Sequence, residues 1–200
     1  MKKIGIFGGT FDPPHLGHLH MAQIAYKELA LDKVYFIPNR VPAYKLKEHG
    51  ISSPEDRLNM LRLMLEEASF GEINTIELDR EGNTYTSDTL RQLKKTEDNE
   101  LYLIIGSDSF KKLSYWHEPK EVFRLSKIVV LLRNDDDFLG MKSLAEEYKE
   151  HFGAMIYILN NNIENISSTE LRRELSNGEW NKDYLPQKVF EYINYKHLYT

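Results

Sequence analysis

Two histidines stand close to two glycines near the start of the chain, where a strand is expected to give way to a helix. His15 and His18 are three residues apart, so both side chains fall on one side of a helix that begins near Leu16. Imidazole N–H groups at this spacing can both donate to one phosphate group. Gly8 and Gly9 let the backbone approach a ligand closely. The pattern predicts a phosphate-binding loop followed by a helix whose positive end faces the same ligand.

Each of these features is ordinary when it is taken alone. A Gly-Gly turn after a strand is more often only a tight turn, and a histidine pair usually lies on a solvated helix face. The loop has neither the Gly-Lys-Ser/Thr signature of a P-loop nor a G-x-G-x-x-G fingerprint, and the local sequence supplies no third ligand for a metal. The complete run from Gly8 to His18, which includes Thr10 and Phe11, is much more specific than its parts.

A second candidate phosphate site lies late in the chain, where Ser167, Ser168 and Thr169 precede Arg172. Ser168 or Thr169 can cap a helix whose free N–H groups receive a phosphate, and Arg172 lies within a turn as a bidentate donor. Taken alone, this segment is more often an ordinary helix cap. Arg173 is expected to face solvent.

The rest of the chain alternates apolar runs of strand length with segments of helical period. Strands are expected at Lys3–Phe7, Val34–Ile37, Ile73–Leu78, Leu101–Ile105, Ile128–Leu132 and Met155–Leu159. Helices are expected at Leu16–Ala30, Pro54–Ala68, Ser87–Lys95, Glu118–Leu125, Phe138–Phe152, Ser168–Leu175 and Gln187–Tyr195. Continuous apolar strands are typical of a parallel sheet that is covered on both faces.

These elements predict an α/β fold, Rossmann-like and doubly wound, with a mostly parallel sheet, helices on both faces and a small C-terminal helical part. One domain is expected over residues 1–200, with 160–200 as a C-terminal helical segment that carries the second phosphate-binding motif. In open sheets of this kind ligands sit at the carboxyl ends of the strands. The residues just after each strand are therefore the first candidates for a site.

Composition excludes several other classes of protein. No apolar run approaches the roughly 18 residues of a membrane span, and Asp12 and two prolines interrupt the first apolar stretch as no secretory signal would tolerate. The chain has no Cys, which removes disulfides, zinc–thiolate sites and a cysteine nucleophile. A net charge of −5 disfavours bulk nucleic-acid binding. We expect a cytoplasmic protein with no nucleic-acid or membrane partner.

The run from Gly5 to His18 resembles the first signature of the nucleotidyltransferases with a His-x-Gly-His motif, and within them of the bacterial nicotinate-mononucleotide adenylyltransferases. The run from Ile166 to Arg172 resembles their second signature, in which a Ser-Ser-Thr helix start and an Arg bind the ATP phosphates. The match extends along nearly the whole chain. It implies adenylyl transfer from ATP to nicotinate mononucleotide, giving deamido-NAD and pyrophosphate, with Mg²⁺ arriving with ATP. Whether the protein forms a homo-oligomer is left open.

Three further segments are similar to the nicotinate branch of that family. The run from Tyr85 to Leu90 is similar to its Ser-Tyr-Thr-x-Asp-Thr-Leu segment, and the run from Gly106 to Asp108 to its Gly-x-Asp. Trp116 stands where the family's Trp stacks on the nicotinate ring, although alone it would be taken for a core residue. The resemblance implies a mononucleotide site that comprises Tyr85, Thr86, Gly106, Asp108, Trp116, His117 and Arg133.

The resemblance also implies roles around the reacting phosphates. His18 would serve the α-phosphate in the transition state, and His15 and Thr10 the reacting phosphates. The ATP and phosphate site would comprise Gly8, Gly9, Phe11, Lys45, Ser167, Ser168, Thr169 and Arg172, with Lys45 and Arg172 at the β and γ phosphates. The mononucleotide phosphate is already largely ionised at neutral pH, so a direct in-line attack needs no general base.

The chain departs from the family at two places. His117 stands where the family commonly has Tyr, and the run from Pro38 to Lys45 ends differently from the usual Pro-His-Lys, with Lys47 near enough to compete with Lys45. A histidine can also donate to a carboxylate, so the choice between acid and amide mononucleotide stays open.

Three other functions remain in view. One is an adenylyl- or cytidylyltransferase of the same fold that acts on phosphopantetheine or an alcohol phosphate. Another is an enzyme that uses nicotinamide mononucleotide as well as the acid. The third is a nucleotide sensor without turnover, which pyrophosphate release would exclude.

Overall fold

The computed structural model describes residues 1–200 except 41–50, 97, 134–135 and 164–165. Within the described residues a six-stranded sheet has the order β3-β2-β1-β4-β5-β6, and all neighbouring strands are parallel. The strands are β1 (Lys3–Gly9), β2 (Lys33–Pro38), β3 (Gly71–Ile73), β4 (Glu100–Gly106), β5 (Lys127–Arg133) and β6 (Ile156–Ile163). The predicted Rossmann-like α/β fold is confirmed.

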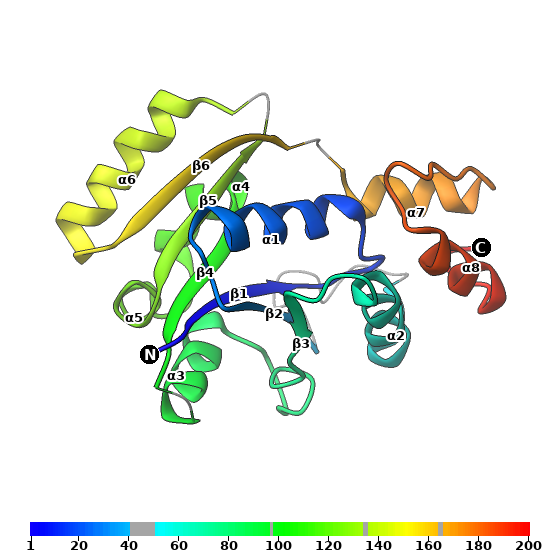
Figure 1. Cartoon of the computed structure of the whole chain (residues 1–200), viewed down its shortest axis with the longest axis horizontal. Coiled ribbons are helices and arrows are strands. Elements are labelled where there is room, and N and C mark those ends of the chain that lie inside the picture. The colour runs from blue at the N-terminus through cyan, green and yellow to red at the C-terminus, as the bar shows by residue number, and fades with distance from the viewer. Residues whose placement is uncertain (41–50, 97, 134–135, 164–165) are drawn as a thin grey trace.

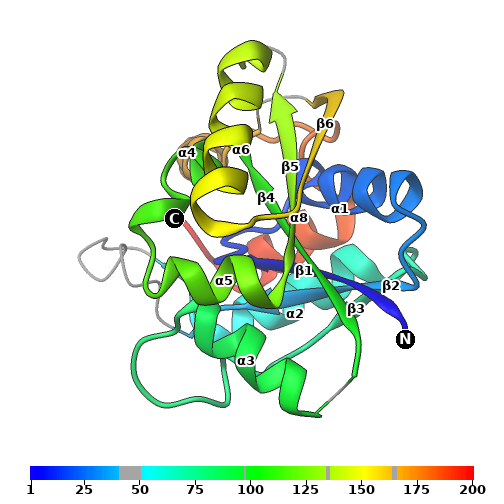
Figure 2. The same cartoon turned by 90° about the vertical axis from the view of Figure 1, so that its left-hand side faces the viewer.

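Helices cover both faces of this sheet (Figures 1 and 2). They are α1 (Leu16–Glu28), α2 (Pro54–Leu65), α3 (Thr86–Thr96), α4 (Ser107–Lys111), α5 (Pro119–Leu125), α6 (Phe138–Phe152), α7 (Ser168–Ser176) and α8 (Gln187–Tyr195), with a 3₁₀ turn η1 (Leu113–Tyr115). One buried apolar cluster joins the sheet to α3, α4, α5 and α6, and a second joins the other face to α1, α2 and α8. The alternation of side chains along buried strands produces these two cores.

The strand expected at Ile73–Leu78 is wrong in position. β3 ends at Ile73, and the following residues form a turn in which the Asn74 side chain accepts the backbone N–H of Ile76 at 3.0 Å. An asparagine that captures a neighbouring N–H competes with strand pairing, which ends the strand early. The sequence prediction also missed α4 and η1, because both are too short to show a helical period.

The strand order reverses at β1 and β4, the two central strands of the sheet. From β1 the chain passes through α1 to β2 on one side, whereas β4 leads to β5 on the other side. Such a reversal of strand order opens the carboxyl ends of the two central strands to a ligand. The first histidine motif follows β1, and Gly106 ends β4. Figure 1 shows α7 and α8 at the right of the view, beyond the end of β1.

No helix among the described residues is both long enough and apolar enough to cross a membrane.

Candidate functional site

The loop between β1 and α1, residues 10–15, is held from below by a buried arginine. Arg57 of α2 is 1% exposed, and its guanidinium donates to the carbonyl of Thr10 at 2.7 Å and to the carbonyl of Asn39 at 2.6 Å. These two bonds tie the β1–α1 loop to the end of β2. At the end of β1, a Cβ on Gly8 would meet no atom within 4 Å, whereas one on Gly9 would lie 3.0 Å from the Phe11 ring. Gly9 is therefore required by packing, and space remains beside Gly8.

The two histidines lie in contact at the start of α1. Their rings stack with centroids 3.6 Å apart, and the His18 ring meets the edge of Phe11 at 5.1 Å. The backbone N–H of His15 donates to Nδ1 of His18 at 3.2 Å. Because Nδ1 accepts this bond, the proton of the neutral His18 ring is assigned to Nε2, which becomes a donor for a ligand.

Both histidines are neutral at physiological pH. Burial lowers the pKa of His15 well below its usual value, and repulsion from His18, in its protonated form, and from Arg133 lowers it further. Burial and Arg133 lower the pKa of His18 to about 3. Within the described part of the chain, Nδ1 of His15 and Oγ1 of Thr10 are buried without a hydrogen-bond partner. Buried polar atoms are nearly always satisfied, so these two indicate a place for a ligand or water.

The lowered pKa values predict that stability falls in mild acid. Below pH 6.5, the usual pKa, the unfolded chain binds a proton on each histidine while the folded chain does not. The free energy of unfolding therefore decreases as pH falls from about 6.5 towards about 3, by up to about 1.4 kcal/mol per pH unit for each ring. Above pH 6.5 both states are neutral and these rings contribute no dependence. Urea unfolding at a series of pH values measures the slope.

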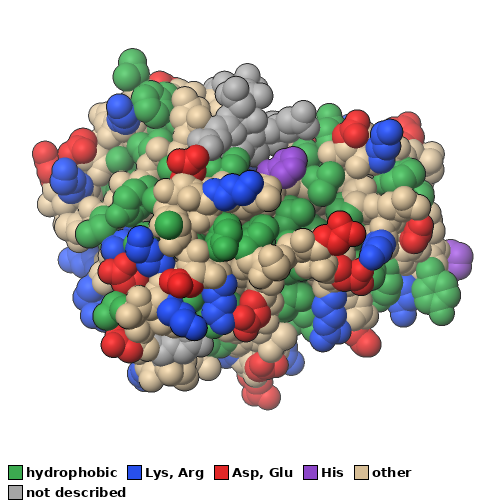
Figure 3. Space-filling model, in the orientation of Figure 1, with side chains coloured by type: hydrophobic (Ala, Val, Ile, Leu, Met, Phe, Trp, Pro, Cys, Tyr) green, Lys and Arg blue, Asp and Glu red, His purple; other side chains and the backbone are tan. Residues whose placement is uncertain are grey.

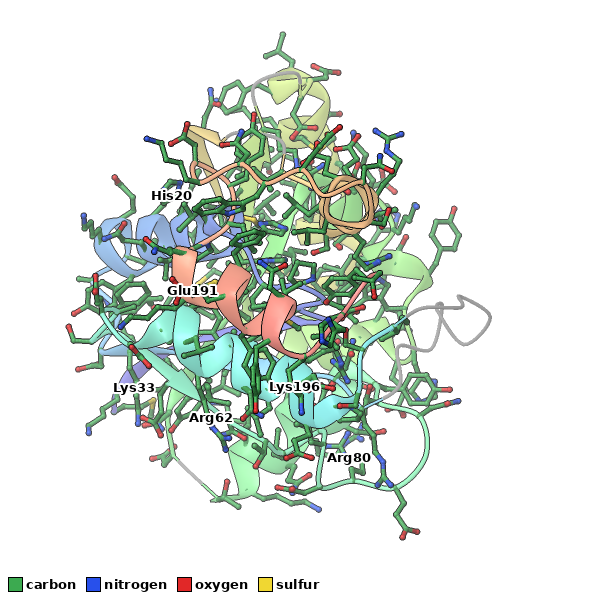
Figure 4. All side chains as sticks on the ribbon, turned by 90° about the vertical axis from the view of Figure 1, so that its right-hand side faces the viewer. His20, Lys33, Arg62, Arg80, Glu191 and Lys196 are labelled. Atoms are coloured by element: carbon green, nitrogen blue, oxygen red, sulfur yellow. The ribbon has the colours of Figure 1, made fainter. Side chains whose placement is uncertain are left out.

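Variants in α1 test which histidine causes this pH dependence of the free energy of unfolding. His18→Ala should flatten the acid side of the stability profile, because one of the two proton-binding differences is removed. His20→Ala is the matched control, since it removes an exposed imidazole from the same helix (Figure 4). An unchanged slope in His18→Ala would contradict the lowered pKa and the neutral state of this ring.

The N-terminus of α1 has fewer free backbone N–H groups for a phosphate than the sequence suggests. The backbone N–H of Leu16 already donates to the carbonyl of Tyr184 at 2.9 Å, and the N–H of His18 donates to the carbonyl of His15 at 2.9 Å. These groups are not free for a phosphate. Side chains therefore carry more of the predicted anion recognition here than helix N–H groups do.

The second motif meets the first one in space. Ser168 of α7 donates its hydroxyl to the carbonyl of Pro13 at 3.0 Å, and Arg172 donates to the carbonyl of Asp12 at 2.7 Å. Arg172 also donates to the hydroxyl of Thr169 at 3.3 Å. The two segments, far apart in sequence, thus form one surface at the end of β1.

The predicted cap of α7 is corrected by the structure. Ser167 is the N-cap residue and makes no side-chain cap bond, so neither Ser168 nor Thr169 caps the helix. The Ser168 hydroxyl is engaged by the β1–α1 loop instead. Arg173 is exposed, as predicted.

The residues expected at the mononucleotide lie at the start of α3 and before α5. Arg91 binds Asp88 at 2.6 Å and Glu118 at 2.7 Å, which ties these two segments together. The rings of Tyr85 and His117 lie 4.2 Å apart. Thr86 begins α3, and Trp116 is half-buried against the core.

A third part of the site follows β4 and β5. Arg133 forms an ion pair with Asp108 at 3.2 Å, and its backbone N–H donates to Asp136 at 2.7 Å. Gly106 immediately precedes α4 and lies near Met21 of α1. Lys45 and Lys47 fall in 41–50 and lie outside the described residues. Of the other candidates, Gly8 and Gly9 end β1, Gly106 ends β4 and Arg133 ends β5.

Sequence reasoning missed the groups that support the β1–α1 loop. Arg57, Asn39 and Tyr199 are not among the predicted site residues, and Asp12 appears there only as a break in the first apolar stretch. One signal could have identified Arg57, because it shares the buried side of α2 with apolar residues such as Met60 and Met64. A charged residue in an apolar helical stripe must find buried partners.

On the face shown in Figure 3, acidic and basic side chains of the described residues are interspersed. An anion therefore meets local groups there rather than a broad field of one sign.

Comparisons with known proteins agree with this geometry. The model of the cytidylyltransferase-like family matches residues 6–174. A protein of Listeria innocua named probable nicotinate-nucleotide adenylyltransferase is 38% identical over 98% of this chain and 97% of its own length. A protein of the same name from Geobacillus thermodenitrificans is 40% identical over 100% of this chain and 87% of its own length.

Solved structures share the fold. A nicotinic acid mononucleotide adenylyltransferase of Plasmodium falciparum, complexed with APC, has a TM-score of 0.82 and 20% identity, covering 100% of this chain and 98% of its own. The same enzyme complexed with NaAD also has a TM-score of 0.82, with 21% identity and the same coverage. At this level of identity the likeness concerns the arrangement of helices and strands.

Proposed function

This chain belongs to the cytidylyltransferase-like family, among relatives named nicotinate-nucleotide adenylyltransferases, and we propose that it transfers AMP from ATP to nicotinate mononucleotide. The products are deamido-NAD and pyrophosphate, and the reaction belongs to NAD biosynthesis. The observation that carries the proposal is the stacked, neutral pair His15 and His18, together with the unpartnered hydroxyl of Thr10 in the same loop. Such a site supplies hydrogen-bond donors but no strong base or activated nucleophile.

The chemical step is a direct displacement at phosphorus. An oxygen of the mononucleotide phosphate attacks the α-phosphorus of ATP, a new P–O bond forms, and the bond from the α-phosphorus to the bridging oxygen breaks. Pyrophosphate leaves with the electron pair. The attacking phosphate is largely ionised at neutral pH, so no general base is needed. The enzyme contributes alignment of two anions and stabilisation of the charge that moves to the leaving group.

Two side chains act at the α-phosphate. Nε2–H of His18 donates to a nonbridging oxygen, because its Nδ1 is held by the backbone of His15. The Thr10 hydroxyl, buried and without a partner among described groups, donates to the reacting phosphates. Because both donors at the α-phosphate are neutral, they do not hold the anionic products by a strong charge attraction.

Arg172 acts at the β and γ phosphates together with the start of α7. One of its guanidinium nitrogens is fixed on the carbonyl of Asp12, which leaves other donors of the same group for phosphate oxygens. Lys45 is proposed to assist there.

Mg²⁺ is proposed to enter as part of the MgATP substrate. The groups around the β1–α1 loop are imidazole, hydroxyl and guanidinium, which are poor ligands for this hard cation. The loop's own carboxylate, Asp12, is buried and already bonded. Phosphate oxygens and water suit the ion better, and it supplies charge neutralisation for the polyphosphate.

The mononucleotide is proposed to lie between the starts of α3 and α4. Asp108 would bond a ribose hydroxyl, and Trp116 would stack on the positively charged pyridine ring. The carboxylate would meet backbone N–H groups near Thr86 and the side chain of His117. Arg133 is proposed to lie near the nucleotide phosphate.

A second candidate, dual use of the acid and the amide mononucleotide, is favoured by one observation. His117 is exposed, and its Nε2 lies 3.8 Å from the carboxylate of Glu118. A neighbouring negative charge weakens the advantage of a carboxylate over a carboxamide at this position.

Pyrophosphate release from ATP and Mg²⁺ tests both proposals. Nicotinate mononucleotide and nicotinamide mononucleotide are supplied separately at equal concentration, and kcat/KM is compared. Preference for the acid supports the first proposal, whereas equal use supports dual specificity. Absence of release with either compound would contradict both proposals. It would favour a transferase that acts on phosphopantetheine or an alcohol phosphate, or a nucleotide sensor without turnover.

A further inference from the structure

A buried carboxylate lies directly behind the β1–α1 loop. Asp12 is 1% exposed, and its carboxylate accepts the backbone N–H of Ser52 at 3.2 Å and the hydroxyl of Tyr199 at 2.7 Å. Arg172 approaches the same carboxylate to 3.9 Å while it donates to the carbonyl of Asp12. Three segments that are remote in sequence therefore meet at one side chain. A buried carboxylate needs such partners to be stable.

The chain reaches Asp12 through a sharp turn after α8. His197 has φ 52°, Leu198 donates its N–H to the carbonyl of Ile193 at 3.0 Å, and His197 donates to Asn194 at 3.2 Å. This pair of bonds is the Schellman arrangement that ends a helix. Tyr199 follows with φ 65°, in a region that residues with side chains rarely adopt. Contacts of the Tyr199 side chain must hold this backbone in place.

The Tyr199 hydroxyl is a permanent donor. Burial raises its pKa, and the negative charge of Asp12 raises it further, so the phenol stays protonated throughout the physiological range. A hydroxyl that donates to a buried carboxylate forms a charge-assisted bond, which is stronger than one between neutral groups.

The position of Arg172 depends on how the Asp12 carboxylate is satisfied. With Tyr199 and Ser52 as donors, the carboxylate is occupied and Arg172 rests on the backbone carbonyl. Without the hydroxyl, the carboxylate regains an acceptor site, and the guanidinium of Arg172 lies 3.9 Å away. A guanidinium drawn into an ion pair is withdrawn from any anion in the site.

We propose that Tyr199 is a positioning residue for ATP, which acts through Asp12 to keep Arg172 available for the polyphosphate. This inference rests on the proposed function, because it assigns a support to the ATP half of that site. It predicts that the Tyr199 hydroxyl matters for ATP and much less for the mononucleotide.

The test compares Tyr199→Phe with Tyr192→Phe. Tyr192 of α8 also donates its hydroxyl to an aspartate, Asp56 of α2, at 2.9 Å, and Lys196 (labelled in Figure 4) lies 3.9 Å from the same aspartate. The two variants each remove one tyrosine–aspartate bond, and only the bond of Tyr199 lies behind the β1–α1 loop. Thermal unfolding of both variants controls for general loss of stability.

Tyr199→Phe should raise KM for ATP about tenfold, while KM for the mononucleotide changes less than about twofold. Calorimetric titration with MgATP should show the same loss of affinity without turnover. Tyr192→Phe should match the wild type in both assays. Wild-type affinity for ATP in Tyr199→Phe would overturn the inference, as would an equal effect on both substrates. If the wild type itself binds no ATP, the proposed function fails and the inference fails with it.

A double-mutant cycle tests the route through Asp12. Asp12→Asn removes the charge that would attract Arg172, so adding Tyr199→Phe to it should cost clearly less than it does in the wild type. Independent, multiplicative losses of ATP affinity would contradict action through Asp12.

Discussion

His18→Ala should fold like the wild type and lose nearly all turnover, by roughly 100- to 1,000-fold in kcat. Its Nε2–H is the donor that the backbone of His15 orients, and alanine offers no substitute. The ring is half-buried at the edge of the site, where it contacts His15 and Phe11 rather than completing the apolar core. Pyrophosphate release under saturating substrates measures the loss, and circular dichroism with thermal unfolding checks the fold.

His20→Ala is the matched control for this experiment. It removes an imidazole from the same helix, two residues further along, where the side chain is exposed (Figure 4). Its turnover should equal that of the wild type. The role of His18 would be refuted by retention of the wild-type rate in His18→Ala, or by a loss that merely follows unfolding.

Arg57→Met should destabilise the protein by about 3 to 5 kcal/mol. Methionine approximates the length of the arginine stem but leaves the buried carbonyls of Thr10 and Asn39 without their donors. It also removes the positive charge that faces Asp12. Urea unfolding gives the free energy directly, and the slope of the transition shows whether the folded state has loosened.

Arg62→Met provides the comparison within α2. Arg62 is exposed (Figure 4) and bonds only Asn59 on its own helix among the contacts that the structure describes. Its loss should change the free energy of unfolding by less than about 0.5 kcal/mol. Equal stability of the two variants would mean that Arg57 does not hold the β1–α1 loop.

The central strands of the sheet could be predicted from the sequence because buried parallel strands have a simple signature. The apolar runs that contain Leu103 and Val130 lie at the centres of β4 and β5, and α6 begins and ends at the residues expected. The position of the histidine motif could also be predicted, because the strand, the two glycines and the helix start that place it are its neighbours in sequence.

The rest depended on contacts between distant residues, which periodicity does not encode. Ser168 has good capping chemistry, yet its hydroxyl is taken by the carbonyl of Pro13. The bond between Tyr199 and Asp12 spans 187 positions and has no local signal at either end. Asn74 ended β3 by a side-chain bond that competes with strand propensity.

The meeting of Asp12 with Tyr199 also bears on how the protein is made. Tyr199 is synthesised 187 residues after Asp12, so the contact between them cannot form while the residues in between are still being added. Contacts of such sequence separation form late, because closing a long loop costs entropy before the contact rewards it. A nucleotide that binds only after Tyr199 has bonded Asp12 stabilises the chains in which this contact has formed. If ATP binds as proposed, it would then stabilise the newly folded protein.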